Sequence, residues 1–118
     1  MKNYQELDVW KKSMLLVKEV YALARLLPKE ETFALSDQMR RAVVSVPSNI
    51  AEGYGRNTTN EYIRFLNIAS GSRCELETQL YICIMQGYFS KKDAQMCFEL
   101  SEDVGKMLSV LIKRLKEK

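Results

Sequence analysis

Apolar side chains recur at steps of three and four residues in four segments of the chain, a spacing typical of one face of an α-helix. These segments cover about residues 7–27, 33–54, 59–87 and 91–116. The joints between them are short, so consecutive helices should pack side by side in opposite directions. The sequence therefore predicts an all-α fold in which residues 1–118 form one domain, an antiparallel up-down-up-down four-helix bundle.

Residues that start or stop helices mark the boundaries of these segments. Pro28 should end the first helix, because proline lacks the amide hydrogen that continues the hydrogen-bond ladder. Thr58 and Glu61 have the spacing of a capping box, in which Thr58 accepts a bond from the amide of Glu61 and the Glu61 side chain reaches back. Ser90 has the character of an N-cap for the last helix. We therefore expect well-defined joints.

Proline and glycine within the second and third segments predict local irregularities. Pro47 removes one backbone hydrogen bond and should kink the second helix. Gly53 and Gly55 should close that helix in left-handed conformations. Gly71 lies in the middle of the third helix, where glycine is unfavourable, so we expect a close approach of another backbone there.

The first and last helices have broader apolar faces than a single bundle core requires. The residues that widen these faces are Leu16, Leu23, Met107 and Ile112. One interpretation is that they form an interface between copies of the chain. The alternative is that they belong to a thick core within one chain.

Charge is mildly basic and unevenly distributed. The chain has 18 Lys and Arg against 15 Asp and Glu, a net charge of +3, which is below the excess typical of dedicated nucleic-acid domains. Most of the excess in the C-terminal quarter lies on Lys113, Arg114, Lys116 and Lys118. These four residues are therefore the candidate phosphate contacts.

Histidine is absent, which excludes His-dependent catalytic triads and metal sites that need imidazole. The three cysteines, Cys74, Cys83 and Cys97, form no C-x-x-C pair, so a zinc site or closed disulfide framework within one chain is not expected. Each lies among apolar residues and is interpreted as a small core side chain. The sequence thus predicts neither a metal nor another cofactor.

No window of the sequence is apolar enough for a membrane span, and the first residues lack the apolar stretch of a signal peptide. We therefore expect no membrane partner and a cytoplasmic protein in a reducing environment.

Polar residues interrupt the second helix at helical spacing. Ser45 and Asn49 are four residues apart and Asn49 and Glu52 three, so their side chains share one side of the helix. They could bond a facing segment of the third helix, where small residues permit close approach. The predicted cluster contains Arg41, Ser45, Asn49, Glu52, Ser72 and Glu75. It either fixes helix register or contacts a ligand or partner.

These residues also form part of a longer pattern, in which the string from Asn49 to Gly53 is followed about twenty residues later by the string from Ala69 to Ser72. Further positions of the pattern are Leu7 to Trp10, Leu27, Pro28, Gln38, Arg41, Ala42, Ser45, Glu61 to Leu66, Ile68, Glu75 and Leu76. The pattern resembles the four-helix bundle family named after proteins encoded in intervening sequences of bacterial 23S rRNA genes. The resemblance spans nearly the whole chain.

This resemblance implies an up-down-up-down bundle, assembly into a homopentameric ring, and no known enzymatic activity or cofactor. It also suggests a relative of similar fold, the accessory protein of diversity-generating retroelements, which associates with a reverse transcriptase and binds nucleic acid.

Two non-catalytic functions follow as hypotheses. The first is a homo-oligomeric accessory or ribonucleoprotein component that binds RNA or DNA through the basic end of the last helix. The second is a scaffold that binds a protein such as a reverse transcriptase without contacting nucleic acid. Its candidate anchors are Arg40, Arg56, Arg64 and Tyr54, because Arg and Tyr are frequent in interface hot spots.

An enzyme is the third hypothesis. Glu52, Glu75 and Glu77 could act as acid and base or bind a metal. Carboxylates without histidine or a phosphate-binding glycine loop make a weak site, so we expect no catalytic residues.

Overall fold

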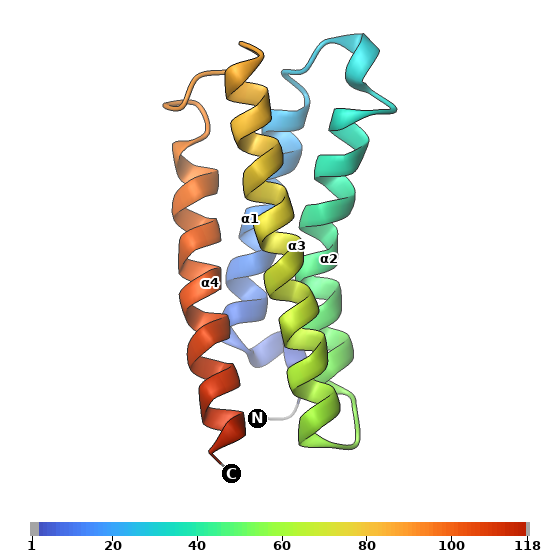
Figure 1. Ribbon diagram of the computed structural model, residues 1–118, viewed down its shortest axis with the longest axis vertical. Coiled ribbons are helices and arrows are strands. Elements are labelled where there is room, and N and C mark those ends of the chain that lie inside the picture. Colours follow the sequence, from blue (N-terminus) through green and yellow to red (C-terminus); the bar gives the residue numbers. More distant parts are fainter. Residues whose placement is uncertain (1–2, 118) are drawn as a thin grey trace.

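The computed structural model describes residues 3–117, which form four long helices. The helices are α1 (Asp8–Ala24), α2 (Leu35–Tyr54), α3 (Thr59–Met85) and α4 (Gln95–Lys116), with short 3-10 helices η1 (Tyr4–Glu6) and η2 (Lys29–Glu31). Successive helices run in opposite directions (Figure 1). We call the end that holds the start of α1, the α2–α3 joint and the end of α4 the terminal end. The opposite end, with the other two joints, is the joint end.

Each helix packs against its neighbours in sequence, and α1 also packs against α4, which closes the bundle. Within residues 3–117 the diagonal pairs, α1 with α3 and α2 with α4, make no close backbone contact. The predicted all-α fold is therefore confirmed. The α2–α3 pair is packed most closely and the α3–α4 pair least.

The core runs along the bundle axis as two apolar clusters, one toward each end. Leu16 is fully buried and Leu23 nearly so, both in the cluster toward the joint end. The prediction that these two leucines serve an interface between chains is wrong, because their side chains point inward and offer no surface to a second copy. Met107 and Ile112 are half-buried beside the other cluster and keep part of their surface exposed.

The helix ends differ from the predicted boundaries by a few residues. The first helix ends at Ala24, before Pro28, and the chain then turns through η2. Thr58 accepts a hydrogen bond of 3.2 Å from the Glu61 amide, which is one half of the predicted capping box, whereas the Glu61 carboxylate pairs with Arg64. Ser90 also has its capping role, but residues 91–94 form a turn and α4 begins only at Gln95.

The glycine and proline predictions have mixed outcomes. Helix α2 continues through Pro47 to Tyr54, and neither Gly53 nor Gly55 has a positive φ; among residues 3–117 only Gly87 does, at 78°. Gly53 instead permits close packing, since a Cβ there would lie 2.8 Å from the Phe65 Cβ. The close approach expected at Gly71 is absent, because nothing lies within 4 Å of a Cβ at that position.

The cysteines have two different environments. Cys83 and Cys97 are buried, as predicted, and burial raises the pKa of the Cys83 thiol to about 11 and that of Cys97 to about 12. These two thiols therefore stay protonated near neutral pH. Cys74 is exposed, so the prediction of a core side chain is wrong there: this position of α3 faces away from the other helices.

Across the described part of the chain, no helix combines the length and the apolar character that crossing a membrane requires.

Candidate nucleic-acid interface

The last turn of α4 carries three exposed cations, Lys113, Arg114 and Lys116. Leu108, Leu111, Ile112 and Leu115 turn toward the core at steps of three and four, so the residues between them face outward. Cations at the carboxyl end of a helix also interact favourably with its dipole. Both effects place the charges at the terminal end of the bundle. The fourth predicted contact, Lys118, lies outside the described residues.

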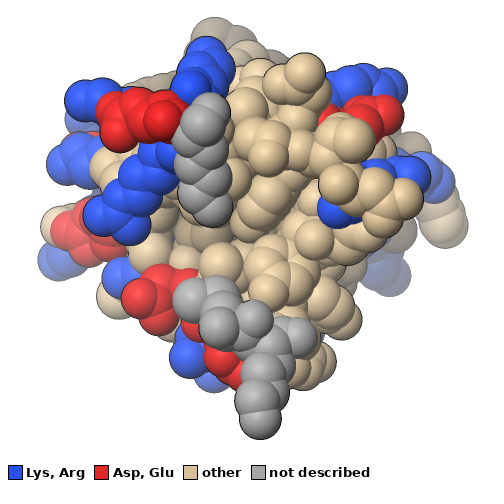
Figure 2. Space-filling model, turned by 90° about the horizontal axis from the view of Figure 1, so that it is seen from below, with Lys and Arg blue, Asp and Glu red and all other residues tan. Residues whose placement is uncertain are grey.

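None of these three cations forms an ion pair with another residue in the range 3–117. Seen from the terminal end, Lys and Arg side chains are more numerous on the side where Figure 1 places α4, with Asp and Glu side chains among them, and the uncovered part of the middle is uncharged (Figure 2). Unpaired cations on one side of a surface are free to contact phosphate groups. We call Lys113, Arg114 and Lys116 the basic end.

The candidate arginine anchors do not form one site. Arg56 pairs with Glu52, and Arg64 pairs with Glu61 at 3.5 Å. Both guanidinium groups also lie over the Phe65 ring, 4.6 and 5.3 Å from its centroid. Their charges are therefore already neutralised by neighbours in the α2–α3 joint region. Interactions of this kind make them weaker candidates for an outside partner than unpaired cations.

Arg40 and Tyr54 lie at opposite ends of α2. Arg40 is near the joint end and donates a hydrogen bond of 3.2 Å to the Thr32 carbonyl oxygen. Tyr54 is at the terminal end, where its ring meets that of Tyr62 edge to face at 6.0 Å. Arg40 therefore lies 14 residues before Tyr54 along α2, so the four candidate anchors do not share one surface.

The predicted polar cluster is smaller than expected and joins α2 to α3. The Ser45 and Ser72 hydroxyl groups are 2.9 Å apart, and the Asn49 amide donates to the Ser45 hydroxyl at 2.8 Å. The other three predicted members do not join them. Arg41 pairs with Asp37, Glu52 pairs with Arg56, and Glu75 is exposed, since these side chains rotate away from the α2–α3 contact.

A second polar network, between α3 and α4, was not predicted. Arg73 donates to Glu77 at 2.7 Å, and the Ser101 hydroxyl donates to the same carboxylate oxygen at 2.7 Å. The guanidinium group lies against Gly105, where a Cβ would come within 2.7 Å of its Cζ atom. Two sequence signals could have revealed this network. Arg73 and Glu77 form a charged i,i+4 pair on α3, and Ser101 and Gly105 form a pair of small residues at the same spacing on α4.

Comparison with known proteins places this bundle in a family. The family model of the 23S rRNA-intervening sequence protein matches residues 5–110. The chain belongs to this family. A crystal structure of a similar protein, described as having unknown function and coming from the S23 ribosomal protein family of Bacteroides thetaiotaomicron, is 27% identical in sequence with a TM-score of 0.82. The match covers 89% of this chain and 98% of that one. No functionally curated protein matches.

Neither the family's description nor that of the Bacteroides relative names an enzymatic activity. In this family member the three candidate carboxylates also have different surroundings. Glu52 pairs with Arg56, Glu77 pairs with Arg73, and Glu75 is exposed on α3. Among residues 3–117 no three Cys, Asp or Glu side chains are grouped as a metal site. The carboxylates that suggested catalysis are thus not assembled into one site.

Beside the basic end, this family member has a partly apolar groove between α1 and α4. It measures about 350 Å³ and includes Met107, Val110, Leu111 and Arg114. Leu15 of α1 lies further along the same helix pair and is 53% exposed. Arg114 therefore belongs both to the basic end and to the wall of an exposed apolar surface.

Proposed function

We propose that this protein is a non-catalytic, self-assembling accessory protein of the cytoplasm that binds RNA through the basic end of α4. The observation that carries this proposal is the absence of any ion-pair partner, within residues 3–117, for Lys113, Arg114 and Lys116. Cations without an internal partner gain most from phosphate, because no existing ion pair must be broken and condensed counterions are released from the nucleic acid.

Self-assembly supports this function by raising the local charge. A single chain carries a net charge of only +3, whereas a homopentamer would carry five times that value. If the subunits were arranged around one axis, their basic ends would lie at the same end of the assembly. A polyanion could then contact several ends at once, so its binding would be multivalent.

The exposed apolar surface on α1 and α4 supports assembly. Met107, Val110 and Leu111 line the groove beside the basic end, and Leu15 extends this surface along α1. Because contiguous apolar side chains at a surface commonly mark interfaces, we propose this surface as the contact between copies. It replaces Leu16 and Leu23, which are buried within one chain.

The test is the salt dependence of single-stranded RNA binding by a variant carrying Lys113→Gln, Arg114→Gln and Lys116→Gln. We expect weaker binding, and a slope of log affinity against log salt that is shallower by about 2 for each basic end that contacts the strand, at about 0.7 per lost phosphate contact. Fluorescence anisotropy with a labelled RNA measures both quantities.

The matched control carries Lys18→Gln, Arg25→Gln and Lys29→Gln. These cations lie in the other half of the bundle and, within the described chain, also form no ion pair. The control removes the same number of positive charges. If it weakens RNA binding as much as the variant of the basic end does, binding depends on overall charge, and the proposal of a specific basic end is contradicted. Assembly without any RNA binding by the unmodified protein would favour the protein-scaffold hypothesis instead.

A further inference from the structure

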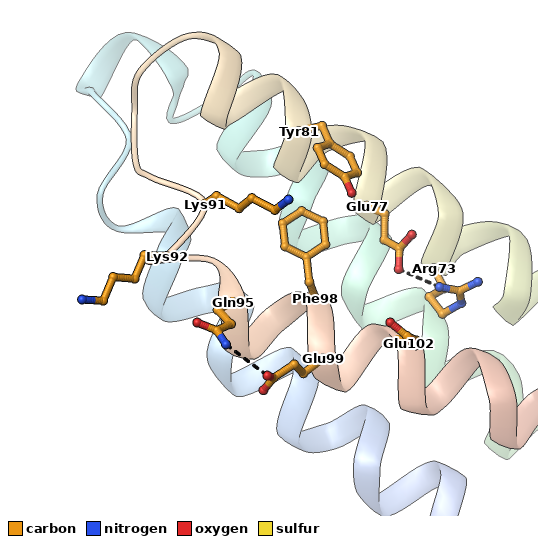
Figure 3. A pocket seen from close by; sticks show the side chains of 9 residues that line it. All are labelled: Arg73, Glu77, Tyr81, Lys91, Lys92, Gln95, Phe98, Glu99 and Glu102. Atoms are coloured by element: carbon orange, nitrogen blue, oxygen red, sulfur yellow. Dashed lines mark hydrogen bonds and ion pairs between the residues drawn. The ribbon is translucent and has the colours of Figure 1, made fainter.

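A second groove lies between α3 and α4 toward the joint end, on the helix pair that is packed least closely (Figure 3). It measures about 620 Å³, within the usual range for small-molecule sites. Its walls come from α3, from α4 and from the turn that precedes α4. The lining residues are Arg73, Glu77, Tyr81, Lys91, Lys92, Gln95, Phe98, Glu99 and Glu102.

Two aromatic rings form the apolar part of the groove. Tyr81 and Phe98 have ring centroids 4.8 Å apart and planes tilted by 42°. Tyr81 is 56% exposed, which is high for a tyrosine in a helix packed against another helix. The pair therefore contributes to the α3–α4 contact and also presents an aromatic surface to the groove. Such a surface accepts a planar ring by stacking.

The carboxylates of the groove already have partners. Glu77 accepts from Arg73 and Ser101, Glu99 accepts from the Gln95 amide at 3.3 Å, and Glu102 pairs with Lys106 at 3.1 Å. By contrast, neither Lys91 nor Lys92 has an ion-pair partner in the described part of the chain. With Arg73 paired to Glu77 and Lys106 paired to Glu102, the charges left around the groove are those of Lys91, Lys92 and Glu99, a net charge of +1.

The lysines stand on a turn whose shape is fixed by reciprocal hydrogen bonds. The Ser90 amide donates to the Asp93 carboxylate at 3.0 Å, and the Asp93 amide donates to the Ser90 hydroxyl at 3.0 Å. From this turn the Lys91 side chain extends toward the rings of Tyr81 and Phe98, whereas Lys92 points away from them (Figure 3). Lys91 thus places a cation beside an aromatic surface.

We infer that this groove binds a nucleotide, with the base stacked on Tyr81 and Phe98 and the phosphate held by Lys91. The inference rests on the proposed function, since it assigns a second RNA contact in addition to the basic end. Stacking on a side chain requires an unpaired base, so the ligand is a nucleotide of single-stranded RNA or a free mononucleotide, not a duplex. Lys92 adds charge at the rim of the groove.

The test compares Tyr81→Leu and Lys91→Gln with the unmodified protein, using a short labelled oligoadenylate and, separately, AMP. Removing the stacking ring should weaken oligoadenylate binding about tenfold. Lys91→Gln should make the salt slope shallower by about 0.7 for each groove that the strand occupies. Tyr81→Phe keeps the ring and should retain the affinity. Ultraviolet cross-linking with mass spectrometry should place the oligoadenylate on Tyr81 or Phe98.

The controls are Tyr4→Leu and Lys18→Gln. Tyr4 belongs to another aromatic pair, in which its ring centroid lies 5.4 Å from that of Trp10. Lys18 is an exposed cation of α1. Both variants should bind as the unmodified protein does, and circular dichroism should show that Tyr81→Leu is folded. Unchanged affinity of folded Tyr81→Leu for both ligands would overturn the inference.

The outcomes separate this inference from the proposed function. If substitutions at the basic end weaken RNA binding and Tyr81→Leu does not, the groove assignment fails and the proposed function stands. If AMP binds in a Tyr81-dependent manner and RNA does not bind at all, the groove is a mononucleotide site and the proposed function fails. Tyr81-dependent binding of oligoadenylate but not of AMP would identify the RNA strand as the ligand.

Discussion

Leu16→Ala is expected to lower the free energy of unfolding by about 2–5 kcal/mol, a large part of the stability of a domain of this size. Leu16 is completely buried in the core cluster toward the joint end, so its truncation removes apolar contacts and leaves a cavity. Urea unfolding followed by circular dichroism, at one fixed protein concentration, measures the change.

The neighbouring Leu15→Ala is the matched control. Leu15 is 53% exposed, so the same truncation should change the stability of the folded chain by no more than about 0.5 kcal/mol. It should instead weaken assembly, which light scattering detects as a lower molar mass on dilution. Equal stability losses for the two variants would contradict the orientation of α1 described above.

Gly53→Ala is expected to destabilise the protein by about 1–3 kcal/mol, the usual cost of overpacking. A Cβ at this position would lie 2.8 Å from the Phe65 Cβ and 3.2 Å from the Tyr62 carbonyl oxygen. Both atoms belong to, or adjoin, the backbone of α3, so they cannot move aside as the tip of a side chain can. Helices α2 and α3, the most closely packed pair of the bundle, would therefore have to move apart.

Gly71→Ala, in α3, is expected to raise the stability instead of lowering it. Nothing lies within 4 Å of a Cβ at Gly71, so alanine should stabilise the helix by about 0.5–1 kcal/mol through its better helix propensity. Thermal unfolding of both variants checks the pair. A stabilising Gly53→Ala would contradict the close packing of α2 against α3, and a destabilising Gly71→Ala would contradict the open surface at Gly71.

The four helices and their order could be predicted because the evidence for them is local. Each helix shows its own apolar period over many turns, and Thr58 and Ser90 supply caps whose hydrogen bonds the structure contains. The extra turn before α4 was missed because the capping signal at Ser90 also fits a single turn.

The orientation of each helix about its axis was harder to predict. On α1 two neighbouring apolar seams compete for the core, and the sequence does not decide between a thick core and an exposed interface. The structure turns Leu16 and Leu23 inward and leaves Leu15 outside. Similarly, a glycine in mid-helix indicates close packing only if its open side faces a neighbouring helix, as Gly53 does and Gly71 does not.

The candidate site depended on contacts between helices that periodicity does not specify. Sequence reasoning located the basic end of α4, because charge composition is visible without a fold. It overlooked the i,i+4 spacing of Glu52 and Arg56 and the i,i+3 spacing of Glu61 and Arg64, which predict the pairing that distinguishes these arginines from Lys113. It also missed the Arg73, Glu77 and Ser101 network, which forms only when α3 and α4 meet in one register.

The most direct test of RNA binding by an assembled protein is the slope of log affinity against log salt for single-stranded RNA, measured at a concentration where light scattering gives the molar mass. The three cations of one basic end would account for a slope of about −2.1. We predict a steeper slope together with a mass of several chains, because more than one basic end contacts the strand. A single-chain mass with a slope near zero would contradict the account.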